Sequence, residues 1–337
     1  MTALQATAVL LLAHGTPNVL GEMAEYLSNV TGGRALPNEV IEELQHRYAE
    51  IGLRETPGAE SPPLTKWTLA QRDGLRNFLA AAGTPLPVYA AMRNWHPYIA
   101  EVVASMRADG VERVITICLA PQNSRTSIGL YRRALMSVAG GLDIQFIDAW
   151  SEEPLLIEAF AQRLLEIYPP ASAEAGSALP VLFTAHSVPC RTIMTGEASV
   201  AGARRGTPPQ TTPDPYPVEA KRTAEFVFAS AERQLPKLNV APAPAWFFAF
   251  QSQGVAGGPW IGPTVEDTLM AIRDEGYKGV ILQPIGFLCD HVEVLYDIDI
   301  AFTQTAAQLG LTLFRPQSLN DSPILIEALA HVVSTHL

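Results

Sequence analysis

The segment Gln283–Asp299 (QPIGFLCDHVEVLYDID) decides the fold class, because an apolar run ends in it and a charged stretch begins. The run from Val280 to Ile285 is rich in branched apolar residues, which predicts a buried strand. The run stops at Gly286, and a helical pattern starts at His291. A buried strand that leads into a helix is typical of parallel α/β sheets.

Charged and ionisable side chains gather just after that strand. They are Asp290, His291, Glu293, Asp297 and Asp299. Asp290 and Glu293 have the spacing of a capping box, which would be purely structural. Glu293 and Asp297 share one helix face as like charges, and this costs stability unless they share a cation or a proton. A structural and a chemical interpretation are both open at this point.

Composition limits the class of protein. The 337 residues suit two domains of ordinary size, and 48% of them are hydrophobic, which is enough for a large core. No run approaches the roughly 20 apolar residues of a membrane span. The formal net charge of −11 argues against a nucleic-acid partner held through its phosphates.

The N-terminus and the cysteines indicate the compartment. No basic residue precedes the apolar run Ala8–Ala13, so this run is better interpreted as a first strand than as a secretory signal. The three cysteines, Cys118, Cys190 and Cys289, form no CxxC pair and no disulfide framework. Together these features predict a protein of the reducing cytoplasm.

Strand-like apolar segments alternate with amphipathic helical segments along the whole chain. The predicted strands are Ala8–Ala13, Pro87–Met92, Arg113–Leu119, Ile144–Asp148, Pro180–Ala185, Trp246–Phe250, Gly279–Pro284 and Thr312–Phe314. The predicted helices are Glu39–Ile51, Pro97–Ala108, Pro154–Ile167, Pro217–Gln234, Thr264–Glu275 and His291–Leu309. This alternation predicts an α/β fold of parallel sheets with helices on both faces.

Two four-stranded halves are expected from this pattern. Residues 169–180 (PPASAEAGSALP) have the composition of a linker near the midpoint. The first half nevertheless ends earlier, with the strand Ile144–Asp148, and the helix after Trp150 begins the second. A further irregular segment, residues 190–217, is too long for an ordinary connection, and its role is left open.

Open α/β sheets bind their ligands at the carboxyl ends of the strands. His14 follows the first predicted strand, His186 the fifth, and the acidic cluster the seventh. Each histidine has a structural alternative: His14 could fill space beside the turn at Gly15, and His186 could cap the segment after its strand. Their number at strand ends exceeds what core filling requires, which favours a functional site.

Several common sites are excluded by their missing motifs. The chain has no HExxH, no paired CxxC and no EF-hand loop, and neither GxGxxG nor a P-loop follows the first strand. A triad of Ser187, His186 and Asp290 is disfavoured, because neighbouring side chains on one strand end point apart and no GxSxG motif is present.

Three segments occur in an order that is specific to one family. They are TAHSVP (Thr184–Pro189), QSQG with GPWIGPTVED (Gln251–Asp267) and PIGFLCDHVEVLYDID (Pro284–Asp299). Together they resemble ferrochelatases, the enzymes that insert ferrous iron into a porphyrin in heme synthesis. Further similar segments are HGTP (His14–Pro17), HRYAEIG (His46–Gly52) and LAPQNS (Leu119–Ser124), so the resemblance covers nearly the whole chain.

The resemblance implies two Rossmann-like domains, each a four-stranded parallel sheet flanked by helices, with a porphyrin cleft between them. The first would comprise residues 1–150 plus 318–337, including a returning C-terminal helix, and the second residues 151–317. The expected partners are porphyrin and Fe²⁺, both substrates, with no prosthetic group. No iron–sulfur cluster is expected, because no cysteine follows Cys289. A monomer without a transmembrane segment is expected.

By resemblance, His186 and Glu293 are catalytic residues that face each other across the porphyrin and contact the metal, and Asp297 continues a metal path outward. Ala301, the next position on that face, departs from the family pattern by carrying no charge, and His14 stands where several relatives have tyrosine. The implied substrate-binding residues are His14, Arg34, Arg47, Tyr48, Ser61, Arg125, Tyr131, Trp260 and Phe287.

The expected mechanism assigns His186 as the acceptor of pyrrole protons, in contact with the metal, and Glu293 as its partner. The sequence leaves open which of the two takes the protons and which delivers the metal. The resemblance to short soluble ferrochelatases implies coproporphyrin III, which has four propionates, with protoporphyrin IX, which has two, as a close second. Arginines that could hold the propionates are numerous in the first part of the chain. The alternatives are a cobalt or nickel tetrapyrrole chelatase and a non-catalytic tetrapyrrole- or heme-binding protein.

Overall fold

The computed structural model describes residues 6–200, 209–254 and 258–337. It contains two four-stranded sheets in which all paired strands are parallel. The first has the order β2 (Val88–Met92), β1 (Thr7–Ala13), β3 (Arg113–Cys118), β4 (Asp143–Ile147). The second has the order β6 (Trp246–Gln251), β5 (Val181–His186), β7 (Gly279–Pro284), β8 (Thr312–Phe314). The predicted fold class is thereby confirmed.

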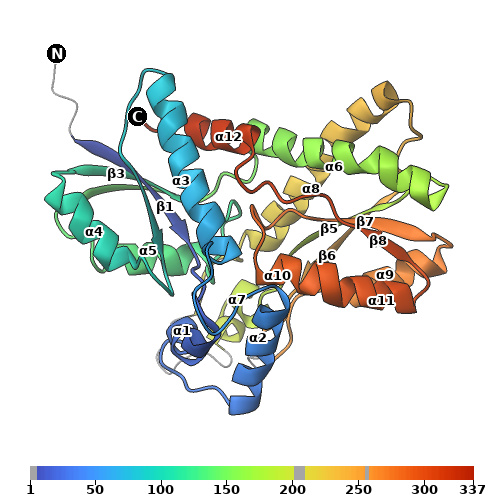
Figure 1. Cartoon of the computed structure of the whole chain (residues 1–337), viewed down its shortest axis with the longest axis horizontal. Helices are drawn as coiled ribbons and strands as arrows, with labels where there is room; N and C mark the ends of the chain where they lie inside the picture. The colour runs from blue at the N-terminus through green and yellow to red at the C-terminus, as the bar shows by residue number, and fades with distance from the viewer. Residues whose placement is uncertain (1–5, 201–208, 255–257) are drawn as a thin grey trace.

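Helices cover both faces of each sheet, and the two sheets form two lobes side by side (Figure 1). The helices are α1 (Met23–Thr31), α2 (Asn38–Glu50), α3 (Pro63–Ala81), α4 (Ile99–Ala108), α5 (Ile128–Met136), α6 (Pro154–Ala175), α7 (Cys190–Ile193), α8 (Tyr216–Gln234), α9 (Val265–Asp274), α10 (Val292–Leu295), α11 (Thr303–Gln308) and α12 (Pro323–Ser334). None of the helices in these ranges combines the length and the apolar character needed to cross a membrane.

Alternation along the strands sorts side chains between separate cores. In β1, Leu10 faces α4 and α5, whereas Leu11 points into a larger cluster with α3 and α12. In β5, Leu182 likewise packs toward α9, whereas Phe183 points into that same larger cluster. The inner faces of both sheets therefore share one apolar core, which α6, α8 and α12 complete.

Helix α6 corrects the predicted linker, because it continues to Ala175 with Pro169 and Pro170 inside it. The prolines are tolerated because their neighbours are anchored in the shared core. Tyr168 is fully buried, and its hydroxyl donates to the carbonyl of Leu179 at 3.2 Å. The low-complexity composition of residues 169–180 was therefore misleading.

The predicted helix His291–Leu309 is also corrected, since it is broken rather than continuous. Helix α10 begins at Val292, and a π-helical turn over Asp297–Phe302 joins it to α11. Such turns widen a helix by one residue and are frequent at functional sites. This one carries Asp297 and Asp299.

Candidate active site

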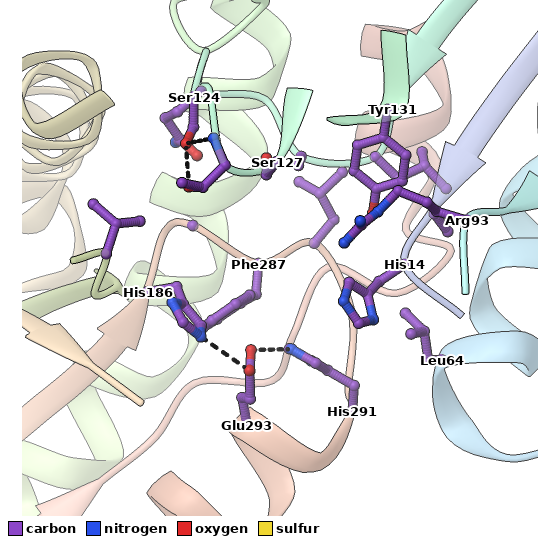
Figure 2. Close-up of a pocket in the computed structure, with 18 of the residues that line it drawn as sticks. His14, Leu64, Arg93, Ser124, Ser127, Tyr131, His186, Phe287, His291 and Glu293 are labelled. Atoms are coloured by element: carbon purple, nitrogen blue, oxygen red, sulfur yellow. Dashed lines mark hydrogen bonds and ion pairs between the residues drawn. The ribbon is translucent and has the colours of Figure 1, made fainter. Parts of the chain in front are cut away.

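A cavity of about 320 Å³ lies at the carboxyl ends of strands from both sheets. The first half of the chain contributes His14 from the end of β1, Arg93 from the end of β2 and Tyr131 from α5. The second half contributes His186 from the end of β5 and the β7–α10 segment with Glu293. The side chains of these elements converge on one space, as Figure 2 shows.

Glu293 lies between two histidines in this cavity (Figure 2). Its Oε1 is 3.1 Å from Nε2 of His186, and its Oε2 is 3.3 Å from Nε2 of His291. No capping box forms, because the cap of α10 is His291 and makes no side-chain cap bond. Asp290 is instead held away from Glu293 by the hydroxyl of Ser318, at 2.7 Å. The carboxylate is thus free of a capping role.

Both ring nitrogens of His186 face acceptors, which is the environment of a protonated imidazole. Nε2 meets Glu293, and Nδ1 donates to the carbonyl of Ser187. Burial alone would lower the pKa of His186, but the charge of Glu293 and its hydrogen bond outweigh burial and raise the pKa to about 9.

Glu293 shows the complementary effect. Burial would raise the pKa of its carboxyl, but the His186 charge and the hydrogen bonds from His186 and His291 hold that pKa well below its usual value. At neutral pH the site therefore presents an imidazolium and a carboxylate in contact. The backbone beneath is fixed by Gln251, whose amide donates to the Glu293 carbonyl at 2.7 Å.

His14 is the opposite case, a neutral imidazole in the same cavity. Burial and the nearby Arg93 charge lower its pKa to about 4. The Asn94 amide lies 2.9 Å from Nε2, and the Tyr26 hydroxyl lies 3.1 Å from Nδ1. With Asn94 donating to Nε2, the remaining ring proton sits on Nδ1, which lies 3.3 Å from the Gly15 carbonyl oxygen and also faces the Tyr26 hydroxyl. Both nitrogens are thus engaged by the protein.

Asp297 lies one turn beyond Glu293 but does not line the cavity. Its carboxylate accepts a hydrogen bond from the Ser252 hydroxyl and lies 3.9 Å from the Arg47 guanidinium. Burial and the charge of Glu293 raise its pKa, against the Ser252 bond. Among the described residues, no group of three or more His, Cys, Asp or Glu side chains is arranged to hold a metal ion.

A model of the ferrochelatase family matches residues 6–337 of the chain. The chain belongs to the ferrochelatase family. It is 53% identical over 334 residues to a ferrochelatase of Acidobacterium capsulatum, covering 99% of this chain and 95% of that protein. It is 31% identical to a coproporphyrin III ferrochelatase of Geobacillus thermodenitrificans, covering 99% and 97% of the two.

The structural comparison agrees on the fold. SirB from Bacillus subtilis, solved with Fe³⁺, has a TM-score of 0.51 at 11% identity and covers 97% of this chain and 94% of its own. The family match and the relatives confirm the predicted resemblance and the predicted activity, which is insertion of iron into porphyrin for heme synthesis. Iron and porphyrin are the substrates of this ferrochelatase.

Some of the predicted substrate residues line the cavity and others do not. His14, Tyr131, Trp260 and Phe287 border it, together with His186 and Glu293. The side chains absent from its wall are Arg34, Arg47, Tyr48, Ser61 and Arg125. The predicted residues therefore divide into side chains on the cavity wall and side chains that project elsewhere.

Each of those five has a different setting in the ferrochelatase. Arg34 lies exposed in the loop after α1, and Arg47 pairs with Glu43 at 2.9 Å. Tyr48 is buried beside a small adjoining cavity, and Ser61 borders an outer pocket before α3. The Arg125 guanidinium donates to the backbone carbonyls of Thr192 and Thr212, so it ties these two positions to the first half of the chain.

The sequence analysis noted His291 in the cluster after the seventh strand without giving it a role, and it did not single out Asn94 or Tyr26. His291 lines the cavity, and Asn94 and Tyr26 contact His14. His291 and Asn94 follow predicted strands at short distance, so the strand-end rule could have selected them. Tyr26 gives no such signal, because it comes from α1, a helix that the sequence pattern did not predict. Its contact with His14 is known only from the folded chain.

Proposed function

We propose that this ferrochelatase binds porphyrin in the cavity with the pyrrole nitrogens facing His186 and Glu293, and that this pair exchanges iron for protons. The observation that carries the proposal is the contact of imidazole and carboxylate at 3.1 Å on the cavity wall. Both side chains are about one third exposed, at 33% and 31%, so substrate can reach them.

Two protons must leave the porphyrin as the metal enters. Because its pKa is raised, His186 is charged at neutral pH and cannot accept a proton while Glu293 balances it. A divalent cation that arrives beside Glu293 neutralises the carboxylate in place of the imidazolium. This lowers the pKa of His186 and favours its neutral form. His186 then releases its proton to water and accepts one from a pyrrole nitrogen. It passes that proton to water in turn and accepts the second, so that both protons leave.

Three further predicted residues take supporting roles in this proposal. Phe287 and Trp260 offer apolar surface to the faces of the ring, and Asp297 lies on the path of the metal, next to Arg47. A ring held out of plane would expose its nitrogen lone pairs to the metal. The three cysteines are free, which supports the predicted reducing compartment. That the protein is a monomer stays a prediction.

We infer that coproporphyrin III is the preferred porphyrin. Relatives about 30% identical along almost their whole length are named coproporphyrin III ferrochelatases. The test is anaerobic Fe²⁺ insertion into coproporphyrin III and protoporphyrin IX side by side. We expect a kcat/KM at least about tenfold higher for coproporphyrin III, since each carboxylate contact contributes roughly 1.5–3 kcal/mol. Equal or higher values for protoporphyrin IX would refute the assignment.

A further inference from the structure

Arg93 brings a positive charge into the cavity that the mechanism above does not use. It follows β2 and lies between Tyr131 and His14, on the far side of the cavity from His186 (Figure 2). Among the described residues that line the cavity, Arg93 is the only arginine or lysine. Its carbon Cζ lies 5.5 Å from the centre of the Tyr131 ring.

Arg93 is half-buried, and its guanidinium has few partners among the described residues. Its protein partner is Tyr131, through the ring face and a hydrogen bond. Among the residues that the structure describes, no hydrogen-bond partner reaches its buried Nε, and no carboxylate lies within ion-pair distance of the guanidinium. Even a partly buried cation is destabilising when it lacks an anion, so such a group in a ligand cavity favours an anionic ligand.

A second observation comes from α3, which borders the same cavity. Thr68 and Gln71 are fully buried, and both line the cavity wall. Within the described part of the chain, the Thr68 hydroxyl and the Gln71 side-chain oxygen have no hydrogen-bond partner. Buried polar atoms are nearly always satisfied, so these two indicate that a polar group of a ligand or a water occupies this part of the cavity.

We propose that Arg93 and the Thr68 hydroxyl bind a carboxylate of the porphyrin and so select for the tetracarboxylate substrate. The guanidinium and the hydroxyl can both donate to carboxylate oxygens, and a charge-assisted contact of this kind is stronger than a neutral one. Protoporphyrin IX carries vinyl groups at two positions where coproporphyrin III carries propionates. A vinyl group there leaves the cation and the hydroxyl unpaired, which penalises binding.

The inference rests on the proposed function, because it places a porphyrin in the cavity. Arg93→Met keeps an apolar stem and removes the charge. We expect kcat/KM for coproporphyrin III to fall about ten- to a hundredfold, while that for protoporphyrin IX stays level or rises. Thr68→Val should also lower the ratio of kcat/KM for coproporphyrin III to kcat/KM for protoporphyrin IX, by a smaller factor.

Arg76→Met is the matched control, because Arg76 lies on the surface of α3 and pairs with Asp73 at 3.0 Å. Its two kcat/KM values should equal those of the original chain. An equal loss for both porphyrins in Arg93→Met, or an unchanged ratio, would overturn the inference. The assignment of coproporphyrin III as the preferred substrate fails by a separate result, a preference of the original chain for protoporphyrin IX. Melting temperatures of all variants show whether the fold is retained.

Discussion

Glu293 accepts hydrogen bonds from histidines on both sides, although its spacing from Asp290 also fits a capping box. The capping box does not form, because the side chains of Ser318 and Asn320, from a later part of the chain, donate hydrogen bonds to Asp290. Sequence spacing alone could not reveal these partners. The histidines on either side of Glu293 also set the charge of the site.

Replacing Glu293 with Gln tests this assignment directly. The variant keeps the shape but removes the charge that holds the pKa of His186 high, so that pKa should fall below its usual value as burial takes over. Iron insertion should fall about a hundredfold or more, the scale of a lost acid–base group. The His186 pKa is measured by NMR titration of its ring, and the rate by anaerobic assay.

The matched control is Glu101→Gln. Glu101 lies on α4 and accepts from its own helix start, the Tyr98 N–H at 2.8 Å, so it has the capping role that Glu293 lacks. We expect this control to lose a little stability and no activity. If Glu293→Gln behaves in the same way, Glu293 is structural and the proposed mechanism is wrong.

At the scale of elements, the ends of β1 and β2 are held together where they present His14 and Arg93. The Arg93 N–H donates to the carbonyl of Ala13, and the Asn94 N–H donates to that of His14, both at 3.0 Å. Gly15 makes this approach possible: its φ is +92°, and a Cβ there would lie 2.9 Å from the Trp95 nitrogen. A side chain would force the two strand ends apart.

Gly15→Ala is therefore expected to lower the free energy of unfolding by more than the backbone strain of a positive φ would alone. Gly33 supplies the comparison, because its φ is +87° and a Cβ added there would have no neighbouring atom within 4 Å. Gly33→Ala should lower the free energy of unfolding by about 1 kcal/mol, and Gly15→Ala by at least about twice that. Denaturant unfolding measures both values. Equal losses would mean that the strand ends can separate without cost.

The elements were predictable wherever apolar periodicity is strong. The predicted bounds of Gly279–Pro284 and Thr312–Phe314 coincide with β7 and β8. Helix α3 escaped prediction because Thr65, Thr68 and Gln71 occupy buried positions on it, so its inner face carries no clear apolar stripe. Polar burial of this kind is compensated only by tertiary partners or a ligand.

The candidate site was predictable where its residues follow strands, and it was not predictable where the direction of a side chain depends on tertiary contacts. His14, His186 and Glu293 were found because strand ends of parallel sheets converge. Arg34 and Arg125 were assigned by resemblance, and neither lines the cavity, because the direction of a long side chain depends on its tertiary neighbours. The division of the chain at residue 150 stays a prediction.

At the scale of the whole molecule, the two sheets share one apolar core, so neither half is an independent body. Helix α12 lies against both α3 and α6 (Figure 1). Its Leu329 is fully buried in the shared cluster, together with Leu75 of α3 and Leu164 of α6. Truncation of Leu329 should therefore weaken both halves at once.

Leu329→Ala is expected to lower the free energy of unfolding by about 2–5 kcal/mol through the lost burial and the cavity left behind. Because the core is continuous, unfolding should stay a single transition at a lower melting temperature. Tryptophan fluorescence and circular dichroism, recorded on the same samples, test this coincidence. Trp95 and Trp150 report on the first half of the chain and Trp246 on the second.

Met270→Ala, at an exposed position of α9, is the control and should leave the melting temperature nearly unchanged. Two separated transitions would show that the halves unfold independently and that the packing of α12 does not couple them.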